Sequence, residues 1–308
     1  MRVTDSFRFQ LYTATLSTLK AQMDNATNQI ASGKKVLVPA DDPTSYAQNM
    51  QITAEQSQNT QYASNLNSLQ AQGAYYETSL NSVGDLLTTV KQLVVQMSSA
   101  TVDASSRSAA ADQVNTIISQ LAAIGNTKVG NTYIFGGKKG NAPPYQADGT
   151  FSGTNDVAKV AVDSSTTVNA GISGNTIFNG TVSGEGVTLN GTAQPNIDIF
   201  GTLKQLSADL AANDTGALQT DSTNVDNCID LTSNNLAYAG TYTKNISSLL
   251  TTNATTGTTL TETSSNLVDV DTAAAYSDYT TLSTAYQAAL YVMAKVESLS
   301  ILNYLPPA

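Results

Sequence analysis

The stretch that decides the fold is residues 66–97, LNSLQAQGAYYETSLNSVGDLLTTVKQLVVQM. Two rows of residues recur there at a spacing of seven, the second offset from the first by three: Leu66, Gly73, Leu80, Leu87 and Val94, then Leu69, Tyr76, Val83, Val90 and Met97. This is the a/d pattern of a coiled-coil helix, with one glycine where a large residue is expected. A helix from residue 44 to about residue 97 would be roughly 80 Å long at about 1.5 Å per residue. We therefore expect it to need long partner helices, and we assign residues 66–97 to an intramolecular core.

The composition excludes several functional classes. Of the 308 residues 41% are hydrophobic and only 12% are charged, about half the usual quarter. The net charge of -10 argues against binding to nucleic acid or to an anionic membrane. There is no histidine, so the commonest general base and metal ligand is missing. We therefore expect no catalytic, cofactor-binding or metal-binding residues, and no enzyme.

The single cysteine and the N-terminal sequence bear on the compartment. Cys228 allows no internal disulfide, and we expect it to be a small apolar residue on a helix rather than a reactive thiol or an intermolecular bridge. Residues 1–30 lack the continuous apolar segment of a cleaved secretory signal, and no apolar run is long enough to span a bilayer. The chain is expected to stay in the cytosol or to leave the cell by a route without a cleaved signal, and not to insert into a membrane.

The N-terminal arm, residues 1–130, is predicted to be helical. The apolar spacing predicts a helix over residues 7–32, ended by Gly33. Asp42 is placed to cap the long helix, with Pro43 at its first position. A shorter helix is predicted over residues 105–124.

At Asn131 the period changes from that of a helix to that of a strand, and a small β domain is predicted over residues 131–196. Short apolar runs lie between turn-forming residues, and we interpret them as strands: 132–135, 157–162, 176–178 and 186–189. The sequence Gly184-Glu185-Gly186 is a poor dinucleotide fingerprint, because the third glycine and the strand-to-helix context are absent.

Helical spacing returns in the C-terminal arm, residues 197–308. A short helix is predicted around residues 203–210, and a long polar helix over residues 218–250, where Gly257 either bends the continuation or is tolerated in it. A last amphipathic helix is predicted over residues 273–305, stopped by Pro306-Pro307. The predicted fold class is mainly α, a long antiparallel coiled-coil-like bundle of the N- and C-terminal arms with a small inserted β domain.

Specific motifs in both arms resemble the flagellin family, and most of all its members at the junction of hook and filament. The motifs stand in this order: MRVT at 1–4, QIASGK at 29–34, PADDP at 39–43, YIFGG at 133–137 and LSILNYL at 299–305. The resemblance implies a structural protein of the bacterial flagellum, located outside the cell and exported by the flagellar type III apparatus. It implies a homo-oligomeric ring between the first hook-associated protein and flagellin, and a cytosolic export chaperone.

Terminal position and the family together predict a self-assembly interface in the two end helices. We assign it to the following residues: Leu11, Leu16, Leu19, Met23, Met293, Val296, Leu299 and Leu302. Two other interpretations remain open at this point. One is filament flagellin itself, and the other is a secreted adhesin with a helical stalk, which no cluster of aromatic residues in the sequence supports.

Overall fold

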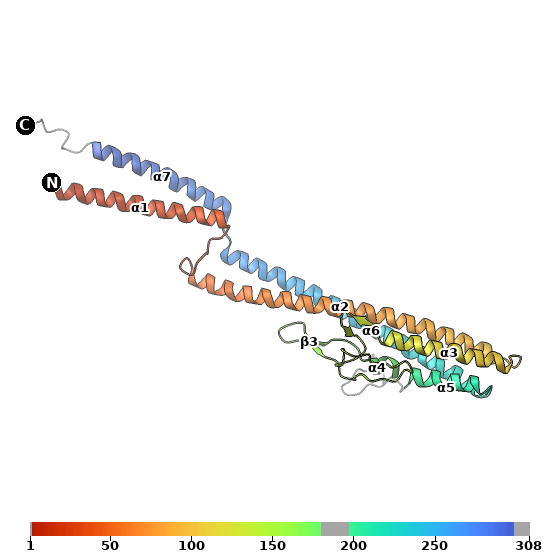
Figure 1. Cartoon of the computed structure of the whole chain (residues 1–308). Coiled ribbons are helices and arrows are strands. Elements are labelled where there is room, and N and C mark those ends of the chain that lie inside the picture. Colours follow the sequence, from red (N-terminus) through yellow and green to blue (C-terminus); the bar gives the residue numbers. More distant parts are fainter. Residues whose placement is uncertain (1, 180–196, 299–308) are drawn as a thin grey trace, which may run out of the picture. The chain divides into compact units, whose positions relative to one another are not determined.

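A computed structural model describes residues 2–179 and 197–298 of the chain (Figure 1). The contacts divide the chain into two compact units, which we describe separately. The terminal unit comprises Met1–Gln58 and Thr256–Ala308, and the central unit comprises Asn59–Thr255. Helices dominate the described residues, and their only sheets are two small antiparallel pairs of strands. The predicted fold class, mainly α with a small β insert, is confirmed.

In the terminal unit, helices α1 (Arg2–Ser32) and α7 (Thr272–Ser298) lie side by side and run antiparallel (Figure 1). Helix α1 ends at Gly33, whose φ of +71° is readily adopted only by glycine. Helix α7 begins after Asp271, whose Oδ1 accepts hydrogen bonds from the N–H groups of Ala273 and Ala274. Both predicted helices are therefore present, but residues 299–305 of the second lie outside the described part.

The two longest helices, α2 (Pro43–Met97) and α6 (Ala217–Val268), contribute residues to both units. The predicted cap of α2 is confirmed, because Asp42 Oδ1 accepts from the N–H groups of Thr44 at 3.0 Å and Ser45 at 3.1 Å. The side-chain hydrogen bond from the Ser45 hydroxyl, together with these bonds, lowers the pKa of Asp42. Gly257 lies within α6, so the glycine is tolerated and the predicted polar helix continues to Val268.

The core of the central unit is formed by the predicted seam of α2 with α3 (Ala104–Gly125), α5 (Ile199–Ala211) and α6. The seam residues of α2 are buried: Leu66, Leu69, Gly73, Tyr76, Leu80, Val83, Leu87, Val90, Val94 and Met97. This confirms the intramolecular core. Cys228 lies on helix α6, as expected, and it is fully buried. None of the described helices combines the length and hydropathy that a membrane span requires.

The β part of the central unit consists of two small hairpins. Strand β1 (Lys128–Val129) pairs with β2 (Thr132–Tyr133), and β3 (Lys159–Ala161) pairs with β4 (Thr167–Asn169), both antiparallel. The predicted strands 132–135 and 157–162 are thus present but shorter. The predicted run 186–189 and the Gly184–Gly186 motif lie outside the described residues. The division into 1–130, 131–196 and 197–308 stays a prediction.

The predicted strand at residues 176–178 is wrong, because these residues belong to helix α4 (Gly174–Asn179). The N–H groups of Thr176 and Ile177 donate to the carbonyl of Ser173, and the Ser173 hydroxyl accepts from Asn175 N. These local bonds begin a helical turn, and the turn buries Ile177 and Phe178. A run of three residues, two of them apolar, is too short to distinguish a strand from such a turn.

A buried aromatic cluster joins the β part to the helices. Its members come from α2, the loops, α4 and α5: Tyr76, Phe135, Tyr145, Phe151, Phe178 and Phe200. The Tyr76 hydroxyl donates to the carbonyl of Ile134 at 2.9 Å and accepts from the N–H of Ile172 at 3.1 Å. Phe151 is partly buried and the other five rings are buried, so the cluster belongs to the core of the central unit.

Candidate self-assembly surface

The face of α1 that packs against α7 follows a heptad pattern. Tyr12, Leu16, Leu19 and Met23 are partly buried at alternating spacings of four and three residues, and Ala26 continues the pattern with 7% exposure. The facing stripe of α7 has the same spacing, in the order Ala275, Tyr279, Leu282, Tyr286, Ala289 and Met293. Only Ala275 in this stripe is buried, at 6% exposure. The pair is thus a two-helix coiled coil with half-open seams.

The structure places the predicted interface residues in three groups. Leu16, Leu19 and Met23 lie on the α1 seam and Met293 lies on the α7 seam, so these residues are on the two faces that meet. Leu11 lies outside the seam and is 57% exposed. The backbone of Val296 belongs to α7, but its side chain is outside the described part, as are Leu299 and Leu302.

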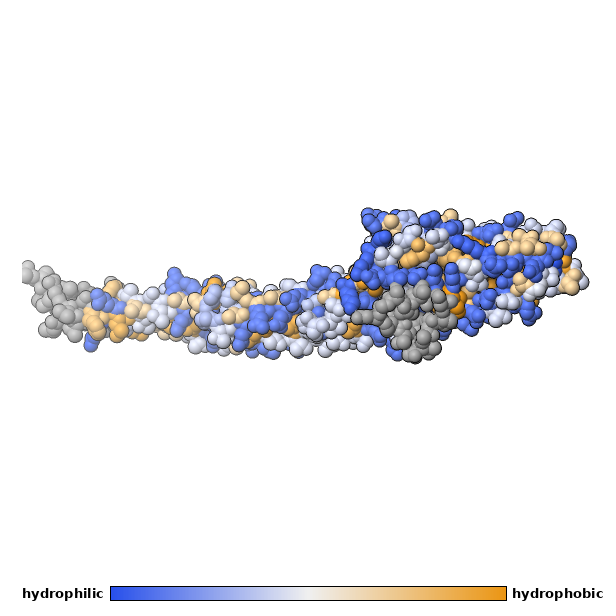
Figure 2. Space-filling view, turned by 90° about the horizontal axis from the view of Figure 1, so that it is seen from below, coloured by the Kyte–Doolittle hydropathy of each residue, from blue (hydrophilic) through white to orange (hydrophobic). Residues whose placement is uncertain are grey.

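Further exposed apolar residues on the same helices were not predicted. They are Phe7 and Phe9 on α1, and Tyr276, Leu290, Tyr291 and Val292 on α7. Figure 2 shows hydrophobic surface where the described part of the α1 and α7 pair ends, beside the grey residues. One signal for this surface is in the sequence, since residues 279–294 contain no charged side chain. The segment 288–294 is composed only of apolar and aromatic residues, so apolar side chains there extend beyond the single stripe that faces α1.

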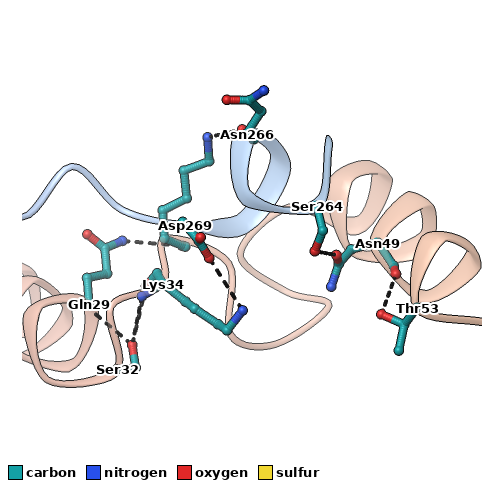
Figure 3. Close-up of polar contacts among 9 residues, drawn as sticks. Gln29, Ser32, Lys34, Asn49, Thr53, Ser264, Asn266 and Asp269 are labelled. Atoms are coloured by element: carbon teal, nitrogen blue, oxygen red, sulfur yellow. Dashed lines mark hydrogen bonds and ion pairs between the residues drawn. The ribbon is translucent and has the colours of Figure 1, made fainter. Parts of the chain in front are cut away.

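A backbone clasp, formed by residues 33–36 and 266–270, joins the base of α1 to the α6–α7 turn (Figure 3). Lys35 N donates to Val268 O at 2.7 Å, and Val270 N donates to Gly33 O at 3.0 Å. Lys34 Nζ lies 3.4 Å from a carboxylate oxygen of Asp269. Hydrogen bonding from Ser265, followed by Lys34, lowers the pKa of Asp269. The clasp also buries two apolar side chains, those of Val36 and Val268, at 7% and 1% exposure.

Beside the clasp, the first part of α2 meets the last part of α6 through polar side chains. The Ser264 hydroxyl donates to Asn49 Oδ1 at 2.6 Å, and the Thr53 hydroxyl donates to the Asn49 carbonyl within the same helix (Figure 3). No group of three or more cysteine, aspartate or glutamate side chains in the described residues has the arrangement of a metal site. The surface itself consists of apolar seams and a few polar contacts.

Comparisons with known proteins match both helical arms. Residues 10–139 match the bacterial flagellin N-terminal helical region, and residues 222–305 match the bacterial flagellin C-terminal helical region, so together the matches cover more than half of the chain. The chain is 26% identical to flagellar hook-associated protein 3 of Escherichia coli and 27% identical to flagellar hook-associated protein 3 of Salmonella typhimurium. Each alignment covers 98% of both chains.

A solved structure, of a candidate flagellar hook-associated protein from Vibrio parahaemolyticus, shares the fold. It has a TM-score of 0.63 at 16% identity, over 74% of this chain and 100% of that chain. The motifs at 29–34, 39–43 and 133–137, which carry the resemblance in the sequence, lie within the N-terminal match, and the motif at 299–305 ends the C-terminal match. The chain belongs to the bacterial flagellin family.

Proposed function

We propose that this protein is a structural component of the bacterial flagellum that joins hook to filament by self-assembly through its terminal helices. The observation that carries the proposal is the α1 and α7 pair, with half-buried seams and exposed apolar residues, in a chain whose arms match flagellin. The names of the two curated relatives support the position at the hook. In this role the protein is not an enzyme and uses no cofactor or metal.

The physical basis is incomplete burial. A two-helix pair covers only one side of each helix, so Leu11, Phe7 and Tyr291 stay more than half exposed. Each square ångström of apolar surface that a neighbour covers contributes roughly 25 cal/mol to association. Because the same uncovered faces are present on every copy, copies can pack head to tail into a closed ring.

The proposed interface keeps the residues assigned from the sequence: Leu11, Leu16, Leu19, Met23, Met293, Val296, Leu299 and Leu302. The proposed partners are further copies of the chain, the first hook-associated protein, flagellin and an export chaperone. The proposed location is the extracellular flagellum, reached through the flagellar type III apparatus without a cleaved signal. The heptad seams support further copies of the chain as partners most directly, because residues along these seams are only partly buried within one copy.

The first test is electron microscopy of a strain that lacks this chain. We expect hooks without filaments and flagellin shed into the medium, both corrected by the full-length chain. Bare hooks with no shed flagellin would instead identify the chain as the filament subunit. Intact filaments would contradict any role at the hook.

Point variants test the interface within the same strain. Leu11→Gln changes an exposed residue, so we expect a normally folded monomer by circular dichroism but few filaments per cell. Gln10→Asn is the matched control, at an exposed polar position beside it. Equal motility of the two variants would remove Leu11 from the interface.

Deleting residues 1–30 or 290–308 is expected to leave a helical monomer that does not join the hook. Loss of all helicity would instead show those residues to be core.

A further inference from the structure

A buried carboxylate in the central unit has no partner for one of its oxygens. Asp221, near the start of α6, is 3% exposed, and its Oδ2 makes no hydrogen bond in the described structure. An ionised carboxylate taken out of water without a donor is strongly unfavourable. The expected responses are a bound cation, a basic neighbour or a retained proton.

The neighbours of Asp221 are acidic. The carboxyl group of Asp209, on α5, lies within hydrogen-bonding reach, and Asp214 lies in the turn between the two helices. Asp209 already accepts at 3.0 Å from Gln205 Nε2, and Asp214 Oδ1 accepts from the N–H groups of Gly216 and Ala217. These bonds leave the Asp209 and Asp221 pair without a donor between them.

The basic side chains of the packed helices are engaged with other groups. Arg107 of α3 donates to the carbonyls of Met97 and Ser99 and to Asn213 Oδ1. Lys91 of α2 donates to Ser222 and to Asp226 Oδ2. Lys204 of α5 pairs with Asp148 at 3.5 Å. None of these contacts neutralises Asp221.

We propose that Asp221 and Asp209 share one proton, and that the resulting carboxyl–carboxylate hydrogen bond is a pH-sensitive latch between α6 and α5. With the proton in place, the O–H of one acid donates to an oxygen of the other, so the unpartnered oxygen acquires a bond and the pair carries a single negative charge. Loss of the proton leaves two like charges in contact, which separates the helices at this corner.

The pKa of Asp221 changes in the direction that a retained proton requires. Burial, followed by the charge of Asp209, raises the pKa of Asp221 from its ordinary value of 3.8 to about 6. The folded chain therefore holds a proton that the unfolded chain has released, so folding stability falls as the pH rises from about 4 to about 6. Asp103 caps α3 by accepting a hydrogen bond from the Ser106 N–H at 2.7 Å, as Asp42 caps α2. Both capping carboxylates have lowered pKa values, so their stabilising effect is lost at a more acidic pH than the effect of Asp221.

The test is urea unfolding of the full chain between pH 4.5 and pH 8, followed by tyrosine fluorescence. Asp221→Asn keeps the shape and supplies an N–H donor toward Asp209. The difference between the ordinary pKa of 3.8 and about 6 corresponds to about a hundredfold in an equilibrium constant, so we expect the unfolding constant of Asp221→Asn at pH 8 to be lower than that of the natural chain by up to this factor. Asp209→Asn is also expected to lower the unfolding constant at pH 8, because its amide donates to ionised Asp221.

Asp230→Asn is the matched control, since Asp230 is exposed on the same helix. We expect it to keep the pH dependence of the natural chain, while either latch variant flattens it between pH 4.5 and pH 6.5. Carbon-13 labelling of aspartate would follow the shared proton directly as a carboxyl resonance titrating near pH 6. An Asp221→Asn chain that is less stable at pH 8 than the Asp230→Asn chain would overturn the proposal, as would the absence of any resonance titrating above pH 5.

Discussion

Tyr76 is the side chain through which the longest helix holds the β part, and replacing it with phenylalanine tests that role. The Tyr76→Phe change removes only the hydroxyl group. In the natural chain this hydroxyl donates to the Ile134 carbonyl at 2.9 Å and accepts from the Ile172 N–H at 3.1 Å. Ile134 and Ile172 are buried, at 4% and 6% exposure, so water cannot easily replace the two lost hydrogen bonds. The ring itself keeps its edge contact with Phe135, whose centroid lies 5.3 Å away.

The magnitude follows from the two backbone groups left behind. A buried donor or acceptor without a partner costs about 1–3 kcal/mol. For two such groups, allowing for some relaxation of the loop, we expect Tyr76→Phe to reduce the free energy of unfolding by about 2–4 kcal/mol. Tyr75→Phe is the matched control, because the adjacent Tyr75 is 45% exposed and its loss of a hydroxyl is expected to change stability by less than about 0.5 kcal/mol.

The assay is equilibrium unfolding in urea, with the midpoints of both variants compared at equal slope. Amide exchange adds a local measurement, since the Ile172 N–H loses its acceptor and is expected to exchange faster in Tyr76→Phe. The reasoning is refuted if the two variants unfold at the same urea concentration. It is also refuted if stability falls but exchange at Ile172 does not change, because the loss would then arise from packing.

Three further outcomes are expected. Arg107→Met removes three hydrogen bonds, to Met97 O, Ser99 O and Asn213, and should lower the free energy of unfolding measured in urea by about 2–4 kcal/mol. Arg107→Lys should restore only part of that free energy. Asn59→Leu alone removes the Oδ1 acceptor that lies 2.7 Å from the Asn253 side-chain amide, and it should lower the free energy of unfolding by about 1–2 kcal/mol. Adding Asn253→Leu should restore stability, because no amide is then left unpaired. Strictly additive losses in the double variant would contradict the pairing. In the isolated chain, amide exchange should be faster throughout α1 and α7 than in α3, because the terminal seams are half open; equal protection would show that these helices are complete without neighbours.

The long helices were predictable because their signals are local and periodic. Asp42 and Pro43 mark the start of α2, and the heptad spacing carries the helix to Met97. The polar composition of α6 argues weakly against a helix, but burial of Val225 and Ile246 on one stripe outweighs the low propensity of its many threonine and asparagine residues. Periodicity therefore located the seams even where composition did not favour a helix.

The β part and the buried charges were less predictable, because long-range contacts decide them. Tyr145, Phe178 and Phe200 lie far apart in the sequence, and only the folded chain brings their rings within about 5 Å of each other. Asp221 looks like any helical surface acid, and nothing near it in the sequence indicates that it is buried. For the candidate surface, spacing located Leu16, Leu19 and Met23, but it could not separate the seam from exposed Leu11, since that depends on which side α7 covers.

Polar residues between α2 and α6 explain how a seam of repeating pattern keeps one alignment. In the central unit, the Asn253 amide donates to Asn59 Oδ1 at 2.7 Å and the Asn59 amide donates to the Asn253 carbonyl at 3.2 Å. In the terminal unit, Ser264 and Asn49 form a comparable pair. A slip of one heptad would keep most apolar contacts but would place each amide against a side chain that cannot bond it. Because an unpaired buried amide costs more than an apolar mismatch, these positions select the register at some expense of stability. A chain that assembles by its ends gains from this, since a fixed register sets where the apolar faces of α1 and α7 begin relative to the clasp.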